Sequence, residues 1–395
     1  MKVTDIKVDI LGMDFRNALI VRVETDAGIT GWAETVMKRW SRSIAESILA
    51  IKSYLVGKDP TAIENHWEKI YRDSFWVGGP MHSASLSAID CALWDILAKE
   101  HGLPVHKMLG GPTRDRVPVY CHCPAGSSPE GFAQNVKRCK QRGYHAIKTT
   151  LPLFYGAEVN AKEGGSDYSG TNGAIPRSYR ETEYLDASIW ARIAEFFIAA
   201  REAGGAEMGL ALDCHGRLNL KNARQLCRAL EDVGMMWIEE PTPPENADVL
   251  AEVKRETPIP IAAGERWATI YGVREFLHKG AVDILQCDLV VCGGITGLKK
   301  IAALAEAHYV GMAPHNPNGP LATVLNVQFA ATIPNYVILE TIGSAADQRV
   351  AEMLLKGPLV MEDGSLIVPT GPGWGTTVNP EAFSRFPSLP ESGWR

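Results

Sequence analysis

The sequence predicts an α/β protein whose main part is a (β/α)8-type barrel of the TIM kind, preceded by an N-terminal α+β domain. The chain has 395 residues, which is enough for a barrel and an accessory domain. From residue 117 onward, short apolar runs alternate with helical stretches. Buried parallel strands have such continuous apolar runs because helices cover both faces of their sheet. Six successive runs close on a charged side chain or a histidine, which is typical of the active-site end of a barrel.

The first part of the chain, residues 1–115, is predicted to be the α+β capping domain. Two β-rich segments come first, residues 2–11 and 19–24, and a turn follows at 26–28. Three helical patterns then appear, at residues 43–55, 62–72 and 83–99. We expect the C-terminal tail, residues 360–395, to complete this domain, and the barrel to occupy residues 116–359.

Eight apolar runs are the predicted barrel strands, at residues 117–120, 145–148, 208–213, 235–239, 259–265, 282–288, 309–315 and 336–340. The segment 149–185 interrupts this rhythm, because it is long, polar and rich in glycine where one strand-to-helix loop belongs. Long loops in compact domains are usually functional or disordered. Two interpretations stay open, a mobile surface insertion and a lid over the barrel mouth.

The composition excludes several classes of function. The formal charge is −6 and no run of Lys or Arg is present, so we expect no nucleic-acid partner. No apolar stretch reaches the length of a membrane span, and the N-terminus has the pattern of a strand and not of a signal peptide. The eight cysteines lack CxxC pairs and zinc-ligand spacing. We therefore expect reduced thiols in a cytoplasmic protein.

Six polar residues close successive predicted strands at intervals of 23 to 27 residues. They are Asp213, Glu239, Glu265, Asp288, His315 and Glu340. The interval is one strand–helix unit, so all six fall at the C-terminal ends of barrel strands, where barrel active sites lie. Three neighbouring carboxylates repel one another unless a cation lies between them. Hard oxygen ligands suit Mg²⁺, so Asp213, Glu239 and Glu265 predict a magnesium site; the alternative is three acids in solvated loops.

Two histidines are candidates for proton transfer. Asp288 beside His315 would fix the imidazole tautomer and make His315 a general base. His215 follows Asp213 by two residues, and in an extended strand such positions face the same side. We therefore expect His215 to face the barrel mouth, as a general acid. For each histidine, a hydrogen-bonded structural role is the alternative.

Further candidates lie at the ends of other predicted strands. Lys148 closes the second strand and could be a base, a carboxylate clamp or a cation that sets the local field, with a solvated lysine as the alternative. Arg217 follows His215 in the same loop and could hold an anion. Tyr120 and His122 end the first strand and are candidates for binding hydroxyl groups, although a packing role is equally open.

With these residues in view, the chain resembles the enolase superfamily, in its mandelate racemase-like branch, over essentially its whole length. The N-terminal part carries GWAE at 31–34 and the segment SAIDCALWDILAKEHGLPVHKMLGG at 87–111. Within the branch the chain is most similar to sugar-acid dehydratases of the galactonate dehydratase type. Six barrel segments carry that similarity: DCHGR (213–217), WIEEP (237–241), AAGER (262–266), QCDLVVCGGIT (286–296), APHNPNGP (313–320) and VILE (337–340).

The resemblance implies an enolase-like, modified TIM barrel and a role for each matched residue. Asp213, Glu239 and Glu265 match the Mg²⁺ ligands, and Asp288 and His315 match the His-Asp dyad. Glu340 matches the acid that hydrogen-bonds the substrate carboxylate, and His215 matches the histidine that dehydratases use as acid.

Two further segments bear on the choice between related activities. Where the racemases of the branch carry Lys-x-Lys, this chain has Lys148-Thr149-Thr150, which disfavours two-base racemisation. The segments YCHCPAG (120–126) and Phe154-Tyr155-Gly156 resemble mannonate dehydratases, which makes Tyr155 a further candidate to bind substrate or act as base.

The activity that the resemblance implies is Mg²⁺-dependent dehydration of a sugar acid (an aldonate). The proton next to the carboxylate is removed, and the 3-hydroxyl leaves as water to give a 2-keto-3-deoxy sugar acid. A mannonate- or gluconate-type dehydratase, an epimerase or a cycloisomerase are the alternatives among enzymes. An inactive sugar-acid binder is the alternative outside enzymes. The expected partner is a small-molecule sugar acid, and relatives suggest a homo-oligomer.

Overall fold

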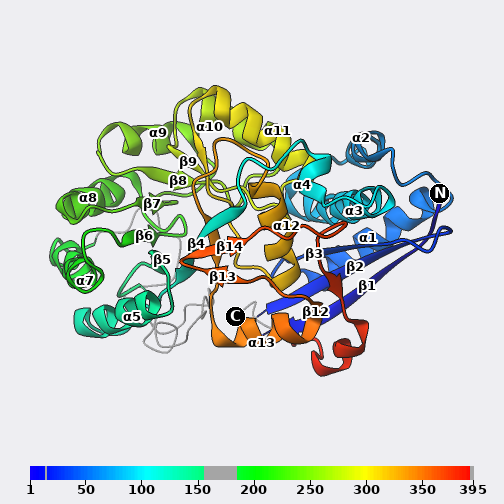
Figure 1. Cartoon of the computed structure of the whole chain (residues 1–395). Helices are drawn as coiled ribbons and strands as arrows, with labels where there is room; N and C mark the ends of the chain where they lie inside the picture. The colour runs from blue at the N-terminus through cyan, green and yellow to red at the C-terminus, as the bar shows by residue number, and fades with distance from the viewer. Residues whose placement is uncertain (14–15, 155–184, 392–395) are drawn as a thin grey trace.

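The structure, a computed structural model, describes residues 1–13, 16–154 and 185–391. An N-terminal unit of three strands and several helices lies beside a barrel with helices on its outside, as Figure 1 shows with the N-terminal unit in blue.

The N-terminal unit is built on an antiparallel sheet. Its strands are β1 (Val3–Met13), β2 (Arg16–Thr25) and β3 (Thr30–Thr35), in that order. The first two match the prediction, whereas the third was not predicted as a strand and carries the GWAE segment. Gly31 is required there, because a Cβ at that position would overlap the carbonyl of Ala92 on the helix packed against the sheet.

Four helices follow this sheet. They are α1 (Ser41–Leu55), α2 (Ile63–Asp73), α3 (Gly79–Glu100) and the short α4 (Val105–Met108). The helices α1 and α3 pack on the strands, and α2 and α4 pack against α3. The three long helices occupy the three predicted patterns, but α3 begins four residues earlier than expected. Pro80 lies in its first turn, where a helix needs no amide donor, so the proline starts the helix instead of preceding it.

Each of the eight predicted apolar runs overlaps a strand of the barrel. These strands are β4 (Arg116–His122), β5 (Ala146–Thr150), β6 (Gly209–Asp213), β7 (Trp237–Glu239), β8 (Ile261–Ala263), β9 (Ile284–Leu285), β10 (Gly311–Met312) and β11 (Leu339–Thr341). Neighbours from β4 to β10 pair in parallel, and β11 pairs in parallel with β4. A parallel bridge between Met312 and Tyr336 links the two ends of this row, so the sheet closes.

One helix follows each barrel strand among the described residues. These helices are α5 (Pro129–Gln141), α7 (Ser188–Gly204), α8 (Leu220–Leu230), α9 (Ala247–Arg255), α10 (Thr269–His278), α11 (Gly294–Ala307), α12 (Pro320–Ala330) and α13 (Ala345–Leu354). A single 3-10 turn, Glu231–Val233, extends α8. Inside the barrel, small and aromatic side chains form a separate core: Tyr120, Ala146, Ala211, Trp237, Ala262 and Ala313.

The strand ends differ from the prediction for three of the six polar residues. Asp213, Glu239 and Glu340 lie on strands, whereas β8, β9 and β10 end before the apolar run does. Glu265, Asp288 and His315 therefore stand in loops, two or three residues beyond the last strand residue. The apolar character continues past the hydrogen-bonded ladder because those loop residues are also buried.

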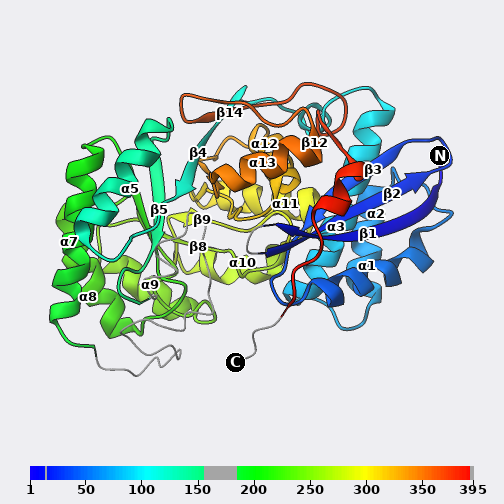
Figure 2. The same cartoon turned by 90° about the horizontal axis from the view of Figure 1, so that it is seen from below.

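The C-terminal tail contacts both parts of the molecule. A hairpin forms from β13 (Met361–Glu362) and β14 (Ser365–Ile367), and β14 pairs with the start of β4 in the barrel. Two short strands, Leu355–Lys356 and Thr377–Val378, pair with each other, and a 3-10 helix spans Pro380–Arg385. Beyond the hairpin the chain crosses to the N-terminal unit (Figure 2). There the Trp374 indole donates to Trp32 O at 2.7 Å. The domain limits given above stay a prediction.

Carboxylates of the N-terminal unit hold it against the barrel. Oxygens of Glu34 lie 2.5 Å from the amide of Gly319 and 3.1 Å from two further amides in the first turn of α12. Asp90 on α3 accepts the amide of Thr296 at 3.0 Å, in the first turn of α11, and Ser87 accepts two amides just before it. The first amides of a helix have no partner within the helix, so these side-chain oxygens satisfy them and join the unit to the barrel.

Two further predictions concern the environment of the chain. All eight cysteines are free thiols, as expected. Over the described ranges, every helix is too short or too polar to cross a membrane.

Candidate active site

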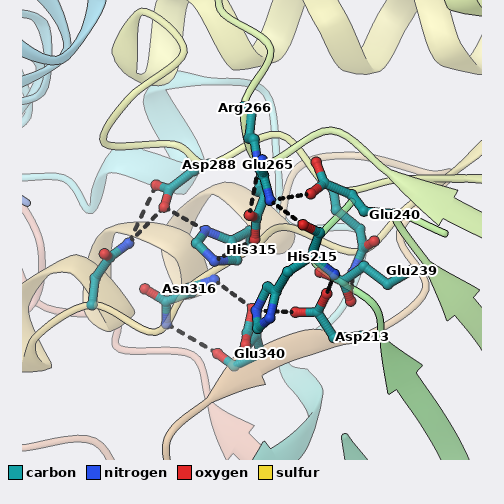
Figure 3. A network of polar contacts seen from close by, with 12 residues as sticks. Asp213, His215, Glu239, Glu240, Glu265, Arg266, Asp288, His315, Asn316 and Glu340 are labelled. Carbon is teal, nitrogen blue, oxygen red and sulfur yellow. Dashed lines mark hydrogen bonds and ion pairs between the residues drawn. The ribbon is translucent and has the colours of Figure 1, made fainter. Parts of the chain in front are cut away.

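Three carboxylates meet at one end of the barrel. Asp213 and Glu239 end the paired strands β6 and β7, and Glu265 stands in the loop after β8. Each offers an oxygen, and these oxygens all lie within 4.8 Å of one another (Figure 3). Asp213 and Glu239 are buried and Glu265 is partly exposed. A compact set of hard oxygen donors with one accessible member fits a Mg²⁺ ion that keeps positions for water and substrate.

The charge of this group is partly balanced by Lys148. Its Nζ lies 3.0 and 3.1 Å from the two oxygens of Glu239, 3.0 Å from Glu340 Oε1 and 3.7 Å from Asp213 Oδ2. Burial and the nearby charge of Asp213 raise the pKa of Glu239 to about 8. Burial opposes the charge of Lys148, but the carboxylates of Glu239 and Glu340 raise its pKa well above the ordinary value. Of the three roles left open for Lys148, this geometry favours the carboxylate clamp.

The predicted dyad is formed. His315 Nδ1 lies 2.8 Å from Asp288 Oδ2, and His315 Nε2 lies 3.0 Å from Glu265 Oε2. The Asn318 amide donates to both oxygens of Asp288, at 3.2 and 3.0 Å. Burial opposes the protonation of His315, whereas the charges of Glu265 and Glu340 and the bond to Asp288 raise its pKa well above the usual value. Asp288 thus orients the ring and leaves Nε2 toward the triad.

His215 also reaches the carboxylates, but for a different reason from the one predicted. Its Nε2 lies 2.9 Å from Asp213 Oδ2, and its amide donates to Asp213 Oδ1 at 2.9 Å. The strand ends at Asp213, and His215 has a φ of 51°, which is left-handed and not extended. The expectation from strand alternation was therefore wrong in its physical basis: a turn places the ring beside Asp213.

Glu340 connects the last strand to the rest of the site. It is buried on β11, and its Oε2 accepts the amide of Asn316 at 3.0 Å. Its Oε1 is hydrogen-bonded to His122 Nε2. Burial opposes ionisation of Glu340, but Lys148, His315 and His122 hold its pKa well below the ordinary range. His122 therefore lies in the site next to Glu340.

The other predicted residues have different outcomes. Tyr120 is fully buried inside the barrel, edge-on to Trp237 at 5.5 Å between ring centroids, which favours the packing role over hydroxyl binding. Arg217 lies in the same turn as His215, where its amide donates to Cys214 O at 3.1 Å; anion binding by Arg217 stays a prediction. Tyr155 and most of the 149–185 segment lie outside the described residues.

Several site residues were not singled out from the sequence. Gln286 donates to Glu239 Oε2 at 2.8 Å, Asn316 and Asn318 bond Glu340 and Asp288, and Arg266 joins three strand ends. All lie in segments that carry the family resemblance. A single amide or guanidinium has no spacing signal of its own, so only their neighbours could have drawn attention to them.

A cavity of about 350 Å³ opens beside the dyad, between the two parts of the molecule. Its walls include Glu265, Arg266 and His315 from the barrel and Arg16 and Lys38 from the N-terminal unit. The volume lies in the range of small-molecule sites, and the N-terminal unit supplies one wall.

Comparisons with known proteins agree with this geometry. Residues 131–382 match the domain family described as enolase C-terminal domain-like. Residues 3–110 match the N-terminal domain of the mandelate racemase and muconate lactonizing enzymes. The chain belongs to the enolase superfamily, in the mandelate racemase and muconate lactonizing enzyme family. The predicted family is thereby confirmed.

Two relatives named for their activity narrow the class of enzyme. D-galactonate dehydratases from Ralstonia pickettii and Pectobacterium atrosepticum are each 34% identical to this chain, over 95% of it and 92% of their own length. These relatives confirm the predicted enzyme class, a carbon–oxygen lyase.

Solved structures confirm the fold class. An enolase superfamily member from Salmonella Typhimurium has a TM-score of 0.87 at 28% identity, covering 98% of this chain and 99% of its own. A candidate L-alanine-DL-glutamate epimerase from Burkholderia xenovorans, with magnesium and fumarate bound, has a TM-score of 0.86 at 27% identity, covering 98% of this chain and 96% of its own.

Proposed function

We propose that this protein is a Mg²⁺-dependent sugar-acid dehydratase that converts an aldonate into its 2-keto-3-deoxy product. The observation that carries the proposal is the meeting of two histidines on one carboxylate triad: His315 bonded to Asp288 and His215 beside Asp213. Relatives named D-galactonate dehydratase support the substrate class. The cavity offers room for a molecule of this size.

The first difficulty of the reaction is the weak acidity of the proton next to a carboxylate. Asp213, Glu239 and Glu265 would hold a Mg²⁺ ion, which supplies positive charge for the negative charge that develops on the substrate carboxylate. Lys148, within 3.0 Å of Glu340 Oε1, keeps a second positive charge at the same place. Gln286 and Lys148 hold Glu239 in its orientation from two directions.

His315 takes the C2 proton in this proposal. Asp288 binds its Nδ1, so Nε2 is the atom that accepts the proton. The Asp288 carboxylate then stabilises the imidazolium that forms. Asn318 donates to Asp288 from the other side. Asn318 thereby holds the carboxylate that orients the His315 ring.

His215 supplies the proton that the leaving group needs. A hydroxyl group departs poorly unless it is protonated, so the C3–O bond breaks as His215 Nε2 gives its proton and water leaves. The electrons of the C2–H bond form the double bond between C2 and C3. The resulting enol takes a proton at C3 and releases the proton of its C2 hydroxyl to solvent, which gives the 2-keto acid.

The related enzymes differ from this scheme after the first step. An epimerase returns a proton to C2 from the opposite face and has no use for an acid at the 3-hydroxyl. His215 contacts the triad from a different part of the barrel than His315. This second histidine can serve as the acid at the 3-hydroxyl, and its presence therefore favours elimination over epimerisation. Which aldonate is used, a cytoplasmic location and a homo-oligomeric state stay predictions.

The test is a screen of sugar acids with the purified protein and Mg²⁺, in which 2-keto acid formation is read as the semicarbazone. We expect turnover of one or a few aldonates, galactonate among the first to test, and none by the His315→Asn variant. Epimerised acid without 2-keto product would instead establish the epimerase alternative. A protein that binds sugar acids but turns over none would establish the inactive binder.

A further inference from the structure

Arg266 joins three strand ends of the site. It follows Glu265 in the loop after β8. Its Nη2 donates to the backbone oxygen of His215 at 2.9 Å and lies 2.9 Å from Glu240 Oε2. Its Nε lies 3.3 Å from Glu265 Oε1. Figure 3 shows the guanidinium between His215, Glu240 and Glu265. One nitrogen therefore holds the turns after β6 and β7 together.

The two residues that this nitrogen holds have unusual backbones. His215 has a φ of 51° and Glu240 a φ of 39°. Glu240 directly follows Glu239 at the end of β7, and His215 lies two residues beyond Asp213 at the end of β6. For residues other than glycine this left-handed region costs about 1 kcal/mol or more. The amide of Gly216 donates to the carbonyl of Glu240 at 2.7 Å, so the two turns are also bonded to each other. Such conformations persist only where the surroundings hold them.

The Glu240 carboxylate fixes the guanidinium in turn. Glu240 is 1% exposed, whereas the Arg266 side chain is 33% exposed and lines the cavity. A buried carboxylate requires a charged partner, and Arg266 reaches it from the side of the cavity. Glu240 therefore fixes the position of the Arg266 guanidinium, and the guanidinium fixes the position of the His215 carbonyl.

We propose that Arg266 is a positioning residue for His215: with Glu240, it holds the turn after β6 so that the His215 imidazole faces the leaving hydroxyl. This proposal rests on the proposed function, because it assigns Arg266 to the elimination step and not to removal of the C2 proton. Asp288 and His315 stand in the loops after β9 and β10, where His315 is oriented by Asp288 and Asp288 by Asn318.

Arg266→Met tests the proposal, with Arg224→Met as the matched control. Arg224 also pairs with two carboxylates, Glu252 and Glu256, and is 29% exposed, but lies on the outer helices. We expect Arg266→Met to lower kcat for dehydration by about 10- to 100-fold, since small misplacement of a catalytic group has effects of that size. Exchange of the C2 proton with D₂O and the KM should change by less than about threefold. Arg224→Met should leave all three unchanged.

A double variant decides whether Arg266 acts through His215. If it does, adding Arg266→Met to His215→Asn gives no further loss of dehydration, because the group that Arg266 positions is already gone. Additive losses would overturn the proposal, as would a parallel fall of dehydration and exchange, or a raised KM with unchanged kcat. Arg266→Lys, which keeps the charge toward Glu240 but lacks the fork of the guanidinium, should give an intermediate loss and serves if the methionine variant does not fold.

A measurement without substrate separates this proposal from the proposed function. The ¹⁵N signals of the His215 imidazole, assigned by their absence in His215→Asn, should shift in Arg266→Met while those of His315 stay in place. Unmoved His215 signals would overturn the positioning role even if dehydration is established. Wild-type protein that turns over no sugar acid would instead overturn the proposed function, and the spectra would still report on Arg266.

Discussion

The two histidines of the site have different partners, and at the scale of single residues this difference separates their roles. His315 is bonded to Asp288 at Nδ1 and faces Glu265 with Nε2. His215 contacts Asp213 and stands in a turn held by other strands. In the proposed reaction, His315 therefore removes the proton at C2, and His215 supplies the proton to the leaving hydroxyl.

Replacing each histidine should give two different losses. His315→Asn should lose both dehydration and exchange of the C2 proton with D₂O, whereas His215→Asn should lose dehydration and keep exchange. General acid or base assistance is worth a factor of about 10² to 10⁴, so both effects are measurable by NMR and by keto-acid assay. If His215→Asn abolishes exchange while His315→Asn keeps it, the two roles are reversed. If both variants exchange normally, Lys148 or Tyr155 becomes the base to test.

At the scale of elements, the contact between α3 and the first turn of α11 contains a titratable group. Asp90 accepts the amide of Thr296 and is almost fully buried. Burial raises the pKa of Asp90 from 3.8 to about 7. Between these two values the folded chain keeps a proton that the unfolded chain releases. The stability that the protonated carboxyl contributes is therefore full below pH 3.8 and is lost as the pH rises through about 7.

Asp90→Asn removes this titration and keeps an oxygen that can accept the Thr296 amide. We expect the free energy of unfolding of wild type, relative to the variant, to fall as the pH rises from about 5 to about 8, by up to about 1.4 kcal/mol for each unit of pKa shift. The Tm of wild type, relative to the variant, should fall with it. Thermal unfolding followed by circular dichroism at several pH values measures this. A Tm difference that does not change with pH would show that Asp90 is ionised throughout. Asp5, which is partly buried on β1, offers a control position for Asp→Asn.

At the scale of the whole molecule, the sequence was most informative where side chains repeat with the fold. The eight barrel strands were predictable because both of their faces are buried, which leaves continuous apolar runs. The gathering of the six polar residues at one end of the barrel was predictable because one strand–helix unit separates each of them from the next. The ends of β8, β9 and β10 were not, because the hydrogen-bonded ladder stops while burial continues into the loops that carry Glu265, Asp288 and His315.

The local structure at His215 could not be predicted from the sequence for a different reason. Its left-handed backbone is held by Arg266 and by the turn at Glu240, which come from two other strands. The third strand of the N-terminal sheet depends likewise on a distant contact, the approach of Gly31 to Ala92. A conformation that depends on contacts with a distant segment could be recognised only in the structure.

In the proposed reaction, the carboxylate triad holds a Mg²⁺ ion without which the C2 proton is not removed. The most direct measurement is C2 exchange and dehydration in protein stripped with EDTA and verified metal-free by elemental analysis, followed by addition of Mg²⁺. We predict loss of both activities, their return with Mg²⁺, and a higher Mg²⁺ requirement in Glu239→Gln with the fold unchanged. Full exchange and dehydration by the metal-free protein would contradict the claim.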